Sequence, residues 1–138
     1  MHELGPLAGL PKPALYCLLA LLGASLSAVA DPLPPAARAE VVAMLGRLES
    51  SGCQFKRNSS WHSGPEARAH LLRKLDYVEK NASAKTAEEF IALAASKSSI
   101  TGQAYLVQCA KQTPLASAVW LQQQLQEMRI ADQAKLPK

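Results

Sequence analysis

The sequence predicts an α+β domain that is mainly helical, with about four helices and one short two-stranded antiparallel sheet. Apolar residues recur at three- and four-residue steps in four segments, which is typical of helices with one buried face. Two shorter segments have patterns typical of strands: one alternates apolar and polar residues, and the other contains a short apolar run. Each of these two segments contains one cysteine, Cys53 or Cys109, and this pair restricts how the strands can be arranged.

Residues 1–30 have the pattern of a secretory signal peptide. Lys12 precedes an apolar run, and Ala28 and Ala30 occupy the −3 and −1 positions before Asp31. The run is shorter than the roughly 20 apolar residues of a comfortable transmembrane helix. We therefore expect cleavage after Ala30, which leaves no stable membrane span; an uncleaved membrane anchor is the alternative.

The remaining chain is predicted to form one domain. Removing 30 of the 138 residues leaves 108, of which 31–35 form a Pro-rich spacer and 36–138 a single globular domain. The net charge of +4 is unchanged by cleavage, because residues 1–30 contain one acid and one base. The cations are scattered, which indicates a solvated basic surface, and export argues against a nucleic-acid partner.

The first predicted helix starts near Ala36, and Ser50 to Gly52 end it. A strand over 53–57 and a turn over 58–60 follow. The second helix runs from Gly64 to about Lys80. It opens with the Ser-x-x-Glu spacing of a capping box, and its apolar face comprises Ala67, Leu71, Leu75 and Val78.

A second capping box, Thr86 to Glu89, opens the third helix. Residues 96–102 form a polar loop, and 104–109 are predicted to be the second strand. Thr113 and Pro114 then begin the last helix, which extends through Met128.

The two cysteines fix the arrangement of the predicted sheet. In an oxidising compartment Cys53 and Cys109 are expected to form a disulfide, which needs Cα atoms within about 7 Å. Cys53 begins its strand and Cys109 ends its own, so antiparallel pairing brings them side by side whereas parallel pairing separates them. Phe55 then faces Val107 and Arg57 faces Tyr105, with these side chains on the core face.

Polar residues on the second helix form a candidate site. Glu66, His70 and Lys74 follow one another at four-residue steps, and Lys74 lies near the apolar face. One interpretation is a small polar pocket formed by His70, Lys74 and Arg57. The alternative is structural: Lys74 extends past the core edge and His70 makes a structural hydrogen bond.

Catalytic and metal patterns are weaker. The hydroxyl-rich loop from Ser96 to Gly102 could bind an anion or supply a serine nucleophile with His70 as base, but it lacks the Gly-x-Ser-x-Gly turn. Cysteine and histidine spacings match no zinc motif. We therefore expect no metal and no cofactor.

The ordered set of motifs resembles one known family. It comprises Cys53–Asn58, Glu66–Leu71 with Lys74, Thr86–Ile91, Ala95–Ser99 with Gly102 and Tyr105, and Trp120–Leu121. This set is similar to the YfeK-like family of small exported bacterial proteins, which is grouped as a domain of unknown function. The resemblance covers nearly all of 41–129 and implies a periplasmic protein, but no activity.

Six residues match the family pattern and are the candidate binding residues: Arg57, Asn58, His70, Lys74, Ser98 and Tyr105. The family has Asn-Gly where this chain has Asn58-Ser59, which puts a tight primed turn after Asn58 in doubt, since glycine favours it. The family usually has tyrosine near His62, which makes His62 a poor candidate for a shared function.

The leading interpretation is a non-enzymatic binding or interaction module of the cell envelope, with an envelope protein or a small anionic ligand as partner. One alternative is a small periplasmic hydrolase or transferase that uses His70 with a loop serine. Another is an inhibitor of an envelope-attacking enzyme, although a basic inhibitor of a basic target would lack electrostatic steering.

Overall fold

The computed structural model describes residue 9, residues 31–81 and residues 84–138. The expected signal peptide, residues 1–30, lies outside the described residues apart from Gly9. Within the described ranges, no helix is both long enough and apolar enough to cross a membrane.

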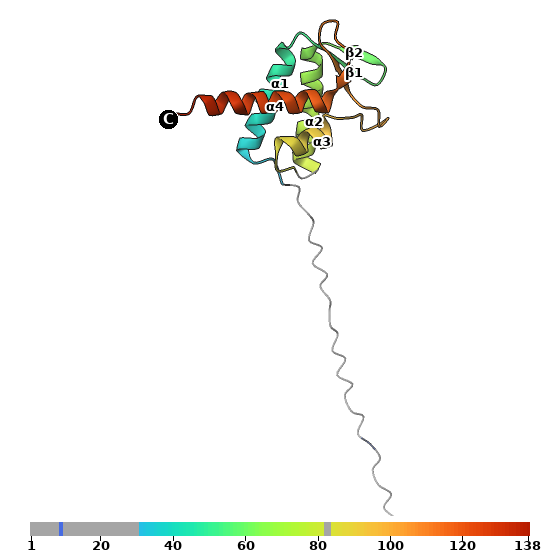
Figure 1. Ribbon diagram of the computed structural model, residues 1–138. Coiled ribbons are helices and arrows are strands. Elements are labelled where there is room, and N and C mark those ends of the chain that lie inside the picture. Colours follow the sequence, from blue (N-terminus) through green and yellow to red (C-terminus); the bar gives the residue numbers. More distant parts are fainter. Residues whose placement is uncertain (1–8, 10–30, 82–83) are drawn as a thin grey trace, which may run out of the picture.

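Four helices build most of the domain: α1 (Pro35–Ser50), α2 (Gly64–Asn81), α3 (Ala87–Ala94) and α4 (Ser117–Ala134). Helix α4 crosses the others and contacts α1 and α3, while α1 packs mainly on α2 (Figure 1). The predicted helices are therefore confirmed, except that the last one begins at Ser117 rather than at Thr113.

The helix starts follow the predicted capping chemistry. Thr86 Oγ1 accepts the amide hydrogen of Glu89, and Glu66 Oε2 accepts the amide hydrogen of Ser63. Gly64 opens α2 where the end of α1 approaches closely. A Cβ at this position would lie 2.6 Å from the carbonyl oxygens of Leu48 and Glu49, so only glycine fits.

The sheet contains four antiparallel strands and not the two that the sequence predicted. They are β1 (Gln54–Arg57), β2 (Ser60–His62), β3 (Leu106–Gln108) and β4 (Leu115–Ala116), in the order β2-β1-β3-β4. The two central strands were predicted. The added strands are very short, and each lies at an edge of the sheet.

A two-residue turn allows β2 to pair with β1. Arg57 pairs with Ser60, so Asn58 and Ser59 alone reverse the chain. Asn58 adopts a φ of 55°, which asparagine tolerates better than most residues, and Ser59 is not in this region. A tight turn therefore forms without glycine, although it is not type I′, which needs positive φ at both positions.

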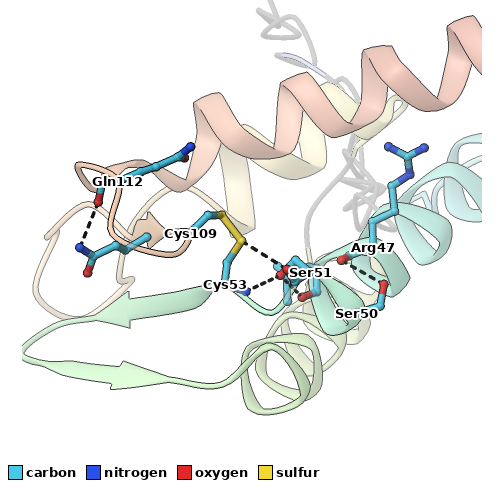
Figure 2. Close-up of a disulfide and its surroundings, with 8 residues drawn as sticks. Arg47, Ser50, Ser51, Cys53, Cys109 and Gln112 are labelled. Carbon is cyan, nitrogen blue, oxygen red and sulfur yellow. Dashed lines mark hydrogen bonds between the residues drawn. A yellow bond between two sulfur atoms is a disulfide. The ribbon is translucent and has the colours of Figure 1, made fainter.

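The disulfide and the strand register agree with the prediction. Cys53 and Cys109 are bonded, with their Cα atoms 4.2 Å apart, and Phe55 pairs with Val107. Figure 2 shows the disulfide beside the end of α1, where Ser51 Oγ accepts the Cys53 amide hydrogen. The disulfide therefore links the end of β3 to the segment that connects α1 with β1.

The core lies between the helices and one face of the sheet. Its largest fully buried side chains include Phe90, Met44, Leu45, Leu75 and Leu121. Leu33, within the segment 31–35, is also buried against this core. On the outside, Arg129 of α4 bonds to Glu40 of α1 and Glu88 of α3, which fixes α4 across its neighbours.

Candidate functional site

Four candidate residues form one hydrogen-bonded chain between the sheet and α2. At the end of β1, Arg57 Nη1 donates to His70 Nδ1 across 2.6 Å. His70 Nε2 lies 3.2 Å from Tyr105 Oη, just before β3. Lys74 Nζ, one turn further along α2, donates to Tyr105 Oη and to the Lys97 carbonyl oxygen, each at 3.2 Å.

This geometry settles the protonation of His70. A guanidinium can only donate, so Nδ1 must accept the Arg57 hydrogen and the ring proton must lie on Nε2, which donates to Tyr105. Burial first, and then the charges of Arg57, Lys74 and Arg73, lower the pKa of His70 from 6.5 to about 4. His70 is therefore a neutral ring that orients Arg57 at physiological pH.

Burial also shifts the pKa values of Lys74 and Tyr105, in each case towards the neutral form. Burial, and then the charge of Arg57, lower the pKa of Lys74 from its usual value. Burial raises the pKa of Tyr105, and the charge of Arg57 opposes that change. The phenol is therefore neutral, and its oxygen accepts from both His70 and Lys74. Lys74 Nζ also lies 5.0 Å from the Tyr105 ring centre, where a cation is attracted to the ring.

A cleft of about 340 Å³ opens beside this chain, within the size range of small-ligand pockets. Residues of β1, β2 and α2 line it, together with Tyr105 and Ser117. Its wall has a buried apolar part, where Phe55 and Leu71 lie, and a polar part that includes Arg57, His70 and Tyr105. The cleft can therefore hold a small molecule that has both a polar and an apolar end.

The charge of the cleft is unbalanced. Three basic residues line it, Lys56, Arg57 and Arg73, and the Lys56 ammonium lies 5.7 Å from the centre of the Trp61 ring. Within residues 31–81 and 84–138, no carboxylate oxygen lies within 4.0 Å of any of them or of Lys74. Elsewhere, cations such as Arg38 and Arg129 do have carboxylate partners.

Glu66 is the one acid among the residues that line the cleft, and it is already engaged. It accepts hydrogen bonds from the backbone N–H and the hydroxyl of Ser63. These bonds, the backbone bond first, lower the pKa of Glu66, so it stays ionised. An anion from solution is therefore the natural partner of the unpaired cations.

The remaining candidate residues lie outside the lining of the cleft. Asn58 Oδ1 accepts the Thr101 hydroxyl hydrogen at 2.7 Å and so connects the β1–β2 turn to the loop before β3. Ser98 is buried, and its Oγ accepts the amide hydrogens of Ile100 and Thr101 at 3.3 Å. These two residues shape loops. Lys74 is not in the lining either, but its ammonium donates a hydrogen bond to Tyr105, which is.

The predicted site lacks four lining residues that have ionisable side chains: Lys56, His62, Glu66 and Arg73. Glu66 shares a helix row with His70, but the sequence pattern indicates no role for it. His62 departs from the family pattern, which argues against a shared function. It pairs with Phe55 across β1 and β2, and only knowledge of β2 would have placed it on this wall.

The geometry does not favour serine catalysis. Both His70 nitrogens are engaged, with Arg57 and with Tyr105, so neither is free to take a proton from a serine. The Ser98 hydroxyl oxygen is held within its own turn. No group of three or more potential metal-ligating side chains occurs in the described part of the chain.

Comparison with known proteins identifies the family. A family model described as a family of unknown function, DUF5329, matches residues 35–129. No curated protein and no solved structure gives a significant match. The matched span runs from the start of α1 to Arg129 in α4, so it includes the whole sheet, the disulfide and every residue that lines the cleft. The chain therefore belongs to this family of unknown function, DUF5329.

Proposed function

We propose that this protein is an exported, periplasmic binding module of the cell envelope that takes a small anionic ligand in the cleft between β1 and α2. The observation that carries the proposal is the cleft of about 340 Å³ lined by three cations that have no carboxylate partner among the described residues. Unpaired cations around a cleft attract anions.

The hydrogen-bonded chain supports a binding role because it orients Arg57 in advance. His70 accepts from one nitrogen of the guanidinium and in turn donates to Tyr105, which also accepts a hydrogen bond from Lys74. A side chain fixed before the ligand arrives loses less conformational entropy on binding. The size of the cleft favours a small ligand over a protein partner.

Two features of the sequence support the periplasmic location. The apolar run that ends at Ala30 has the form of a cleavable export signal. The motifs that resemble the YfeK-like family also point to an exported bacterial protein. A disulfide between Cys53 and Cys109 is compatible with an oxidising compartment.

Binding can be tested by nuclear magnetic resonance. The full sequence is expressed, recovered as the host processes it, and titrated with acetate and with inorganic phosphate at constant ionic strength. We expect at least one anion to shift the Arg57 side-chain and His70 ring signals in a saturable manner.

The matched variants are Arg57→Gln and Arg47→Gln. Both remove one guanidinium, but Arg47 lies on α1 and pairs with Glu127 of α4. We expect Arg57→Gln to weaken binding by about tenfold or more, as loss of a charged hydrogen bond does, and Arg47→Gln to leave it unchanged. Equal effects of both variants would show that the anion responds only to net charge, and would contradict the proposed site.

A further inference from the structure

We infer that the ligand of the cleft is a carboxylate carried on an apolar group, and not a phosphate. This inference rests on the proposed function, since it names the class of anion that the same cleft selects. The chemistry is shared by a peptide C-terminus and by a free organic acid, and the experiment below separates these two sources.

The donor geometry of Arg57 favours a carboxylate. Its Nη1 is engaged by His70, whereas Nε and Nη2 make no hydrogen bond to any described residue. Those two nitrogens form one edge of the planar guanidinium, and this edge matches the two oxygens of a carboxylate in a bidentate pair. His70 therefore holds the guanidinium by the nitrogen that this pairing does not need.

The apolar part of the cleft wall favours a ligand that carries an apolar group. Phe55 and Leu71 reach the cleft from β1 and α2, and Ala67 and Ala69 leave room beside them on α2. Inorganic phosphate would leave this surface in contact with water. A ligand with a phenyl or branched alkyl group would cover it and gain free energy in proportion to the apolar area that it buries.

Glu66, at the first turn of α2, disfavours phosphate. Helix N-termini are common phosphate sites because their free N–H groups point at the ligand. Here Ser63 Oγ already accepts the Glu66 amide hydrogen, and the Glu66 carboxylate adds a negative charge at this end of the cleft. That charge repels a dianion more strongly than a monoanion.

The experiment compares four probes by calorimetry at about pH 7, where carboxylates are ionised: 3-phenylpropionate, its amide, acetate and inorganic phosphate. The protein is the full sequence as the host processes it. We expect 3-phenylpropionate to bind about tenfold or more tightly than each of the others. A second pair, acetyl-alanyl-phenylalanine with a free C-terminus and the same peptide amide, tests the peptide source in the same way.

Two variants make the test specific. Glu66→Gln keeps the capping box, because glutamine also serves at that position, but removes the charge. We expect this variant to improve phosphate binding more than 3-phenylpropionate binding. Arg57→Gln should abolish the preference for the acid over its amide.

The outcomes separate the inference from the proposed function. Phosphate binding that equals or exceeds 3-phenylpropionate binding, and that still requires Arg57, would overturn the inference and leave an anion-binding cleft. Equal binding of the acid and its amide would also overturn it. If no probe binds and no anion shifts the Arg57 or His70 signals, both the inference and the proposed function fail. Tighter binding of the dipeptide than of 3-phenylpropionate would support a peptide C-terminus as the source, and the reverse would support a free organic acid.

Discussion

The neutral state of His70 makes a specific prediction about acid stability. The pKa of His70 falls from 6.5 to about 4 in the folded chain, chiefly because the ring is buried. Between these two values an unfolded chain binds the proton and the folded chain does not. Because the unfolded state then holds more protons, the free energy of unfolding falls as the pH drops from about 6.5 towards about 4.

The magnitude follows from the same two values. A pKa change from 6.5 to about 4 corresponds to an upper limit of about 3.4 kcal/mol. His70 is only half-buried, so solvent screens part of the charge that it would carry. We therefore expect His70 to account for about 1–2 kcal/mol of the stability lost across this range.

Urea unfolding at a series of pH values measures this loss, with His70→Asn as the control. Glu66 and Glu88 also have lowered pKa values, so their contributions to stability also decrease as the pH falls. This decrease occurs in the unmodified protein and in the variant alike. The difference between the two curves isolates His70. Parallel curves, or a His70 ring that titrates near 6.5 in the folded protein, would refute the Arg57-to-His70 arrangement.

Three further predictions concern the disulfide, Lys74 and the N-terminus. Replacing Cys53 or Cys109 by serine opens a loop with a sequence separation of 56 and should cost about 4 kcal/mol in urea unfolding; an unchanged midpoint, or free thiols in the native protein, would contradict this. Lys74→Met removes two hydrogen bonds but also the cost of burying a charge, so we expect a loss of about 1 kcal/mol. A loss above about 3 kcal/mol, as large as that from breaking a buried pair, would instead favour a structural role for Lys74. Intact mass of the exported protein should show Asp31 as the first residue, and a membrane-held chain that still begins at Met1 would contradict cleavage after Ala30.

Local sequence signals predicted the helices and the central strand pair. The spacing of Leu71, Leu75 and Val78 and the two capping boxes depend on neighbours within one helix. The disulfide supplied the single long-range constraint that the sequence contained. It was sufficient to set the register of Phe55 against Val107.

The edge strands could not be predicted in the same way. Ser60 to His62 is a three-residue segment whose side chains are mostly exposed, so it shows no apolar alternation. Its pairing depends on Asn58 adopting a positive φ, which the absence of glycine at position 59 made doubtful. Thr113 and Pro114 resemble a helix start, but Leu115 and Ala116 pair with β3, so α4 begins only at Ser117.

The candidate site was predicted only in part, because the rest of it also depends on tertiary packing. Arg57 and His70 could be expected to lie near each other, because strand register and helix spacing placed both at the edge of the core. The cleft itself depends on how α2 lies over β1 and β2. No sequence spacing encodes that arrangement, so Lys56, His62 and Arg73 were not included.

The most direct test of an anion-binding cleft is a crystal structure of the processed protein soaked with the anion that binds most tightly in solution. The account predicts that the anion lies in the cleft between β1 and α2, with its charged oxygens hydrogen-bonded to Arg57 while Arg57 keeps its bond to His70. An anion bound elsewhere at a saturating concentration, with the cleft free of it, would contradict the account.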